Sequence, residues 1–361
     1  MESLGWLTSG ILVYVTAPGV ESMRVFVGEY VCGGGLLQNA PLAIPTSLRT
    51  EGEAMLQAIV SDISFFADAV IPIDPRLGLD IAAQTVEIEP ATAPWAQWAA
   101  AAKQCDSALI VAPESDGTLA KGVAMLRAAG VDVIASSGDF LRVASDKLQT
   151  AKALHDASVA HPLFMSLSDR RFESDLQGCD SFVVKPRDGC GTQEIRTFDS
   201  FAEARDELRE ELILQQWRPG RAVSVSLIAS GNHHTYLPAV AQILRQSTCQ
   251  YDGGCGPLPD DDQRRATSLA SRAIAAMPPT PRGFVGLDLL LADRPSEDCV
   301  IEINPRLTTS YVGLRRMIKG NLAARLFEIE TGPVHCATAV DGVRWTPDGQ
   351  VWVNDVVADG V

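Results

Sequence analysis

The sequence predicts an α/β half with a parallel sheet, followed by an α+β half. Between residues 23 and 138, short apolar runs alternate with segments whose apolar residues recur at helical spacing. This alternation is typical of a parallel sheet with helices on both faces. From about residue 139 the pattern changes, because several strand-like segments follow one another. A chain of 361 residues is long enough for two or three domains with their own cores.

Local patterns assign each element of the first half. The expected strands are 24–31, 69–75, 107–113 and 131–136, and the expected helices are 47–62, 95–105 and 119–130. Residues 1–22 precede a natural first strand, so we expect an extension that is disordered or belongs to a mis-assigned start. Gly33–Gly35 and Glu114 follow the ends of two strands. In open parallel sheets ligands bind beyond the carboxyl ends of the strands.

The second half should contain further strands and helices in an α+β arrangement. The expected strands are 181–186, 212–217, 222–229, 236–243, 283–292 and 299–304, and the expected helices are 139–157, 199–211, 262–277 and 312–330. Residues 248–260 are rich in glycine and proline, which predicts a loop. We therefore expect an N-terminal α/β domain at 23–138, a second domain at 139–335 and a C-terminal tail at 336–361.

Composition narrows the class of protein. A net charge of -15 argues against a nucleic-acid partner, which would require basic patches. No segment reaches the length and hydropathy of a transmembrane helix, so we expect no membrane partner. The eight cysteines form no CxxC pair, and the five histidines do not fall at metal-ligand spacing. These features predict reduced thiols, no zinc site and a cytoplasmic location.

The expected strand at 299–304 carries an unusual set of polar residues. Glu302, Asn304 and Arg306 are spaced by two, so they share one face of an extended chain. Asp288 lies within the preceding apolar strand, and pairing of the two strands would bring it beside Glu302 and Asn304. Two carboxylates and an amide oxygen suit Mg²⁺, which also requires substrate phosphates. A buried polar cluster bonded to the backbone is the alternative interpretation.

Two further segments are candidates for binding a nucleotide. Lys185 ends a buried strand and is followed by the loop RDGCGT, which contains Gly189, Gly191 and Thr192. Glycines let backbone N–H groups approach phosphate oxygens, and a lysine adds positive charge. The alternative is an ordinary turn with an exposed lysine, since this loop is neither a Walker A motif nor GxGxxG. The backbone of Gln215–Trp217 could offer a donor and an acceptor to an adenine edge.

Together, Lys147, Lys185 with RDGCGT, LQQWRPG, Asp288 and EINPR resemble the ATP-grasp superfamily over about residues 139–330. The resemblance implies a preceding pre-ATP-grasp domain and ATP held between two subdomains. Lys147, Lys185 and the loop would contact phosphates, Gln215, Gln216 and Trp217 would form the adenine hinge, and Asp288, Glu302 and Asn304 would hold Mg²⁺. Two Mg²⁺ ions would be expected, and Mn²⁺ could replace them.

The stretches VGEYVCGGG, APESDGTL and INPRLTTSYVGLR look like the tyramine–glutamate ligase family, which serves methanofuran-type cofactors of one-carbon metabolism. This resemblance implies that glutamate's γ-carboxylate is joined to tyramine or tyrosine through an acyl phosphate, with ADP and phosphate released. Arg306 and Lys185 would be catalytic. The candidates for substrate contacts are Glu29, Glu114, Thr308, Thr309 and Tyr311, of which Glu29 or Glu114 could hold an ammonium group. The partners would be small molecules, and a homodimer is allowed.

The sequence also departs from the family pattern. Arg221 and Ala222 stand where many ATP-grasp enzymes carry an acid that contacts ribose, and Gln215 and Gln216 stand where acids are common. These departures leave the ribose contacts open. Two alternatives follow, namely an ATP-grasp ligase for another amino acid or for polyglutamate, and a non-catalytic ATP-binding regulatory module.

Overall fold

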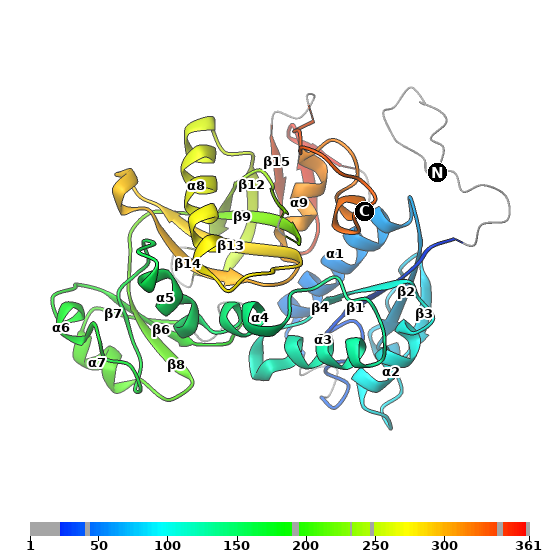
Figure 1. Cartoon of the computed structure of the whole chain (residues 1–361), viewed down its shortest axis with the longest axis horizontal. Helices are drawn as coiled ribbons and strands as arrows, with labels where there is room; N and C mark the ends of the chain where they lie inside the picture. Colours follow the sequence, from blue (N-terminus) through cyan, green and yellow to red (C-terminus); the bar gives the residue numbers. More distant parts are fainter. Residues whose placement is uncertain are drawn as a thin grey trace. The chain divides into compact units, whose positions relative to one another are not determined.

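The computed structural model describes residues 22–39, 44–189, 195–231, 233–245, 249–337 and 342–358. The chain divides into two compact units that interleave along the sequence (Figure 1). The first unit comprises Met1–Ala112, Lys121–Ala135 and Tyr311–Val361, and the second comprises Pro113–Ala120 and Ser136–Ser310. These units are defined by spatial contacts, so the domain boundaries expected from the sequence stay predictions.

The first unit contains the predicted parallel sheet. Its strands are β1 (Arg24–Glu29), β2 (Asp68–Ile73), β3 (Gln84–Glu87) and β4 (Ser107–Val111), in the order β3-β2-β1-β4. All three neighbouring pairs are parallel. The surrounding helices are α1 (Thr46–Ile63), α2 (Pro94–Ala102), α3 (Thr118–Ala128, most of it in this unit) and the 3₁₀ turn η2 (Pro75–Leu77).

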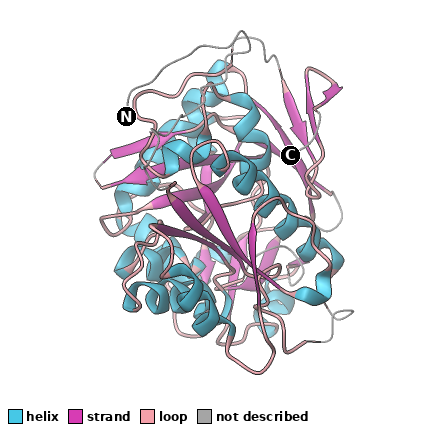
Figure 2. Ribbon diagram, turned by 90° about the vertical axis from the view of Figure 1, so that its right-hand side faces the viewer, coloured by secondary structure: helices cyan, strands magenta, loops and turns pink. Residues whose placement is uncertain are grey.

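Helices cover both faces of this sheet. Gly28 and Glu29 are neighbours on β1, so they face opposite sides. A Cβ on Gly28 would lie 2.3 Å from the ring of Trp98 on α2. The Glu29 carboxyl group lies against α1, where a Cβ on Gly52 would come within 2.7 Å of it. The expected α/β arrangement is therefore confirmed, and its strands and helices can be distinguished in Figure 2.

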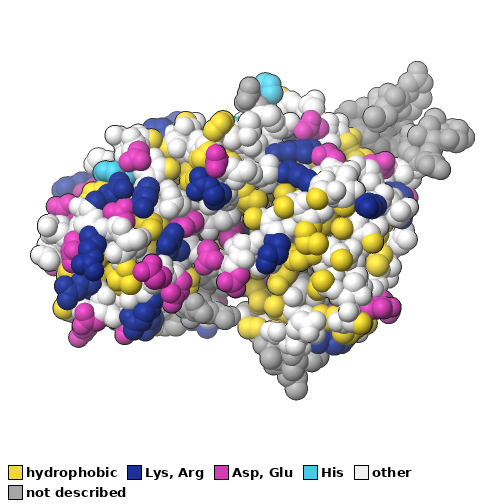
Figure 3. Space-filling model, turned by 60° about the horizontal axis from the view of Figure 1, so that its bottom comes forward, with side chains coloured by type: hydrophobic (Ala, Val, Ile, Leu, Met, Phe, Trp, Pro, Cys, Tyr) yellow, Lys and Arg dark blue, Asp and Glu magenta, His cyan; other side chains and the backbone are white. Residues whose placement is uncertain are grey.

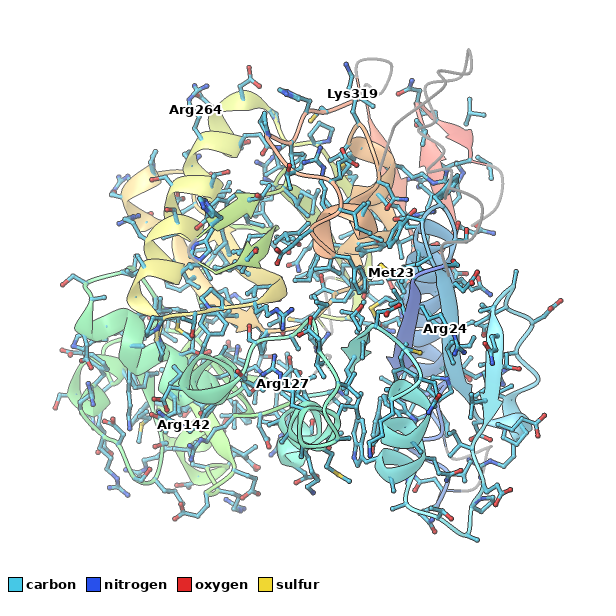
Figure 4. All side chains as sticks on the ribbon, turned by 45° about the vertical axis from the view of Figure 1, so that its right-hand side comes forward. Met23, Arg24, Arg127, Arg142, Arg264 and Lys319 are labelled. Carbon is cyan, nitrogen blue, oxygen red and sulfur yellow. The ribbon has the colours of Figure 1, made fainter. Side chains whose placement is uncertain are left out.

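The expected strand at 131–136 is wrong. Only an isolated parallel bridge joins Val133 to Ala108 on β4. The guanidinium group of Arg127, which is labelled in Figure 4, donates to the carbonyl oxygens of Val133 and Ala135 at 3.0 and 2.6 Å. Carbonyl groups that accept from a side chain in this way do not extend a sheet ladder, so the segment remains irregular.

The last part of the chain docks on α1. It contains α9 (Ser310–Met317), α10 (Leu322–Leu326) and the antiparallel strands β15 (Val343–Trp345), β16 (Val351–Val353) and β17 (Val356–Val357). Asp62 at the end of α1 accepts from the Tyr311 hydroxyl at 2.6 Å and from Arg315 Nη2 at 2.5 Å. The side chains of Asp62 and Arg315 are only 8% and 7% exposed, so this ion pair is buried.

The second unit has two antiparallel sheets. The smaller sheet contains β5 (Phe164–Met165), β6 (Phe182–Pro186), β7 (Arg196–Phe198) and β8 (Leu212–Gln216), in the order β5-β8-β6-β7. The larger sheet has the order β14-β13-β9-β11-β12, with β10 also paired to β9, and its strands are β9 (Arg221–Ser230), β10 (His233–Tyr236), β11 (Val240–Leu244), β12 (Tyr251–Gly256), β13 (Gly283–Leu291) and β14 (Cys299–Asn304).

Helices pack on both sheets of this unit. They are α4 (Gly138–Ala144), α5 (Lys147–Asp156), α6 (Glu173–Leu176), α7 (Phe201–Asp206), α8 (Asp260–Ala276) and the 3₁₀ turns η3 (Ser115–Gly117) and η4 (Pro295–Glu297). One large apolar core joins α4, α5 and α8 to β9, β13 and β14. A second core lies between the smaller sheet and the short helices α6 and α7. The expected α+β character of this half is confirmed.

Two expectations for this unit are wrong. The helix expected over 139–157 is two helices, because the Asp146 side chain caps a new helix by accepting from Leu148 and Gln149 N–H. The loop expected at 248–260 contains β12, which pairs with β11. Glycines favoured a loop in the sequence, yet cross-strand pairing with β11 holds Tyr251–Gly256 extended.

Three further properties of the described residues concern helix hydropathy, cysteine state and surface charge. No helix in the described ranges is long and apolar enough to span a bilayer. The seven cysteines in those ranges are free thiols. On the face shown in Figure 3, acidic and basic side chains are intermingled, so the excess negative charge does not form a single-sign surface there.

We expect the buried Asp62–Arg315 pair to be essential to the first unit. Asp62→Asn removes the charge that faces a buried guanidinium group, which should lower the free energy of unfolding by about 3–5 kcal/mol. The matched control is Asp139→Asn, because Asp139 and Arg142 (labelled in Figure 4) form an Asp–Arg pair that is 75% and 62% exposed. That change should cost at most about 1 kcal/mol. Urea unfolding compares the variants, and equal losses would contradict this assignment.

Candidate functional site

The carboxylates expected to bind metal lie side by side on the larger sheet. β13 and β14 pair antiparallel, with Asp288 opposite Glu302 and Gly286 opposite Asn304. Leu287 and Ile303, which alternate with these residues, are buried in the apolar core on the other face. Strand pairing therefore places Asp288, Glu302 and Asn304 on one polar face, as the sequence predicted.

Two side-chain amides hold Asp288. Gln242 Nε2 donates to Oδ1 at 2.7 Å, and Asn304 Nδ2 donates to Oδ2 at 3.1 Å. Gln242 belongs to β11, which is separated from β13 by β9. The small side chain of Ser224 stands opposite Asp288 on β9. Sequence reasoning missed Gln242, because no local motif marks a residue that acts across an intervening strand.

Two lysines balance the charge of the carboxylate pair. Nζ of Lys147 lies 3.5 Å from Oε2 of Glu302, and Nζ of Lys185 lies 4.0 Å from the same atom. Burial lowers the pKa of Lys185 to about 8, although Glu302 opposes this shift. Burial alone would raise the pKa of Glu302, but Lys147 and Lys185 outweigh it and the pKa is lowered. Burial and the adjacent Glu302 raise the pKa of Asp288.

Lys147 is also joined to the glycine loop. It is the first residue of α5, and its backbone N–H donates to the Arg187 carbonyl at 2.7 Å. Its Nζ donates to the Gly189 carbonyl, also at 2.7 Å. Asp146, which caps α5, forms an ion pair with Arg187. The helix start and the loop therefore form one connected structure, whereas Gly191 and Thr192 lie outside the described residues.

In the expected adenine hinge, two backbone N–H groups are already hydrogen-bonded to neighbouring segments. Gln215 and Gln216 end β8, which lies between β5 and β6. The N–H of Gln216 donates to Leu163, and that of Trp217 donates to Ser181, at 2.8 and 2.9 Å. A backbone donor for a nucleobase would therefore have to come from the next residue, Arg218. The Trp217 side chain is 42% exposed.

Arg306 is held by an acid from a distant part of the sequence. Oε1 of Glu114 lies 2.9 Å from Nε of Arg306, and these side chains are 5% and 13% exposed. Glu114 precedes the 3₁₀ turn η3, which belongs to the second unit. The Asp116 N–H in this turn donates to Asp188 at 2.9 Å, which ties the turn to the glycine loop. The pairing of Glu114 with Arg306 was not expected from the sequence.

The remaining candidates for substrate contacts separate into two groups. Thr308 lies against Gly286, where a Cβ would meet its methyl group at 2.9 Å, and Thr309 follows in the same loop. Glu29 and Tyr311 belong to the first unit and are buried. Glu29 accepts from the Cys32 N–H at 2.7 Å, and Tyr311 donates to Asp62. These contacts hold both side chains within that unit, and the substrate role expected for each stays a prediction.

The polar face fits a hard divalent cation. Asp288 and Glu302 are acidic neighbours, and Asn304 adds an amide group within hydrogen-bonding distance of Asp288. Mg²⁺ binds through one or two carboxylates together with substrate phosphates. Within the described ranges, no cluster of three or more His, Cys, Asp and Glu side chains is suited to a metal ion. The donor set therefore suits a cation that shares its coordination with a ligand.

The site lies in a segment of the chain that matches a known family. Residues 144–310 match the ATP-grasp domain, and residues 67–139 match the pre ATP-grasp 3 domain. The chain therefore carries an ATP-grasp domain preceded by a pre ATP-grasp domain. The acidic face, both lysines and Arg306 all fall inside the ATP-grasp match.

Individual relatives are more distant. The tyramine–L-glutamate ligase of Methanocaldococcus fervens is 26% identical over 215 residues, which cover 59% of this chain and 62% of that enzyme. The match thus spans less than two thirds of the relative. A solved ATP-grasp superfamily protein from Archaeoglobus fulgidus has a TM-score of 0.69 at 23% identity, covering 90% of this chain and 92% of that chain. Biotin carboxylase from Campylobacter jejuni has a TM-score of 0.65 at 12% identity, covering 90% and 75%. These structural likenesses support the fold.

We expect Asp288 to be required for cation binding. Asp288→Asn removes one anionic ligand and should weaken Mn²⁺ binding by at least about tenfold in the presence of ATP, because loss of even outer-shell partners costs roughly 10–100-fold. Electron paramagnetic resonance of free Mn²⁺ measures this directly. The control is Asp261→Asn, which removes the same charge from a side chain that is 85% exposed. If folded Asp288→Asn binds Mn²⁺ as tightly as the wild type, Asp288 is not a metal ligand.

Proposed function

We propose that the protein is an ATP-dependent carboxylate–amine ligase that works through an acyl phosphate. One observation carries the proposal: Lys147 and Lys185 converge on Glu302, beside Asp288, at 3.5 and 4.0 Å. Such an arrangement of cations and hard oxygen ligands suits the phosphates of a nucleotide and its metal ion. It lies within the segment that matches the ATP-grasp domain.

The phosphates of ATP would bind at the charged cluster of Lys147, Lys185, Asp288 and Glu302. Lys147 and Lys185 would contact phosphate oxygens, together with backbone N–H groups of Gly189, Gly191 and Thr192. Asp288, Glu302 and Asn304 would hold Mg²⁺, or Mn²⁺ in its place. When bound, the cation neutralises charge on the phosphates. For this to occur Lys147 would exchange its bond to the Gly189 carbonyl for a phosphate oxygen.

The nucleobase would lie at the end of β8. Gln215, Gln216 and Trp217 would form the hinge, with the Gln216 carbonyl accepting from the adenine amino group. The Arg218 N–H would donate to the ring, because the donors of Gln216 and Trp217 are engaged in the sheet. This refines the expectation drawn from the sequence.

The reaction would have two steps. A carboxylate oxygen of the substrate attacks the γ-phosphorus of ATP, and ADP leaves with the electrons of the broken P–O bond. The nitrogen of an amine then attacks the acyl carbon, loses a proton and expels phosphate. Lys185 would stabilise charge on the transferred phosphoryl group. Arg306, oriented by Glu114, would stabilise the acyl phosphate and the tetrahedral intermediate.

The proposed substrates are glutamate, through its γ-carboxylate, and tyramine or tyrosine. The support is the activity that names the relative from Methanocaldococcus fervens, together with the carboxylate of Glu114 beside Arg306. Glu114, Thr308 and Thr309 remain the proposed substrate contacts. We further propose a place in methanofuran-type cofactor biosynthesis, a cytoplasmic location and a homodimer, whose mass can be measured in solution.

Phosphate release from Mg²⁺-ATP tests the function. L-glutamate with tyramine should give stoichiometric phosphate and an amide of the expected mass, whereas omission of either should give little product. Glu302→Gln should reduce turnover at least about a hundredfold, because it removes a metal ligand and the partner of both lysines. Circular dichroism verifies that the variant is folded. Phosphate without amide would redirect the search to another amine, and ATP binding without phosphate release across an amino-acid panel would favour the regulatory alternative.

A further inference from the structure

Buried acceptors without hydrogen-bond donors gather near Arg306. Oε2 of Glu114 and Oγ1 of Thr308 have no partner among the residues that the structure describes, and neither has Oγ of Ser226. Glu114 is only 5% exposed and Ser226 only 1%. Buried polar atoms are normally satisfied, so such a group of acceptors indicates that a ligand or water supplies the donors.

Two of these acceptors lie at Gly286 on the larger sheet, and Arg306 links the third to the same stretch of chain. Ser226 on β9 stands opposite Gly286 on β13, and Thr308 lies directly against Gly286. Glu114 contacts Arg306, and the Cα atoms of Arg306 and Thr308 are at most about 7 Å apart because only one residue separates them. A Cβ at position 286 would come within 2.9 Å of the Thr308 methyl group. The glycine therefore allows the threonine to sit this close to the strand.

The charges of this cluster select the kind of ligand. Glu114 presents one oxygen to Arg306 and leaves the other without a donor. A carboxylate acceptor on Arg306, together with a hydroxyl acceptor two residues along the chain from that arginine, suits a positively charged group with several N–H donors. Arg306, two residues before Thr308, would at the same time suit a carboxylate or an acyl oxygen. A primary ammonium group and a carboxylate on one small molecule satisfy both requirements.

We propose that Glu114 and Thr308 form the subsite for the α-ammonium group of the amino-acid substrate. This inference rests on the proposed function and specifies how that substrate is recognised. Glu114 would accept from the ammonium through Oε2 while Oε1 keeps its contact with Arg306. Thr308 would accept a second N–H. The substrate class is therefore an α-amino acid with a free ammonium group, and the corresponding acid without nitrogen should bind poorly.

Binding of L-glutamate and glutarate tests this directly, because the two differ only in the ammonium group. Calorimetry uses the full chain with Mg²⁺ and a non-hydrolysable ATP analogue. The wild type should prefer glutamate. Glu114→Gln should weaken glutamate binding by about 10–100-fold and leave glutarate binding within about twofold. If Glu114→Gln weakens glutamate and glutarate equally, the variant has disturbed only Arg306, since both ligands carry carboxylates. That result would overturn the proposal.

Thr308→Val gives a second test that preserves side-chain shape. It should weaken glutamate by about tenfold or less and leave glutarate unchanged. The matched control is Ser107→Ala, which removes another buried hydroxyl without a partner from β4 of the first unit. That variant should bind both ligands as the wild type does.

Other outcomes are equally decisive. A wild type that does not prefer glutamate over glutarate would overturn the subsite. Unaltered glutamate binding with a lower kcat in Glu114→Gln would also overturn it, because that result would indicate that Glu114 transfers a proton. Weakened tyramine binding with intact glutamate binding would place the amine there and also overturn it. Preference for glutamate without any amide formation would sustain the subsite while the proposed ligase function fails.

Discussion

The second unit depends on a balance of charge around Glu302. Asp288 and Glu302 are adjacent acids on a polar face, and such a pair is unfavourable unless cations lie close by. Lys185 supplies that charge from β6 of the smaller sheet, and Lys147 supplies it from α5, which shares a core with the larger sheet. The contact between Lys185 and Glu302 therefore also connects the two sheets. Neutralising either partner would affect both the site and the packing of this unit.

Much of this site could be predicted from the sequence because its signals are local. The spacing of Glu302, Asn304 and Arg306 fixes a shared face once the strand is recognised, and β13 is long and apolar enough to be recognised as its partner. The break before Lys147 could also have been found. Asp146 is a favourable N-cap residue, but the apolar periodicity on both sides of it concealed the boundary.

Contacts between distant segments could not be predicted in the same way. Gln242 on β11 reaches Asp288 on β13 across the intervening strand β9, where the small Ser224 stands opposite Asp288. Glu114 was correctly marked as following a strand end, yet its partner Arg306 is far along the chain. Tyr311 follows EINPR in the sequence, yet its hydroxyl donates to Asp62, 249 residues earlier in the chain. Proximity to a motif therefore did not predict which distant side chain Tyr311 contacts.

The separation of Asp62 from Arg315 has a consequence for the order of events during synthesis. These partners are 253 residues apart, and the second unit is encoded almost entirely between them. At ribosomal rates of about 5–20 residues per second, Asp62 would wait roughly 10–50 s for its guanidinium partner. The second unit can therefore acquire its core on the ribosome before the first is complete. During that interval the end of α1 carries an acid without its final counter-ion, so the Asp62 carboxylate depends on water for its hydrogen bonds until α9 has been made.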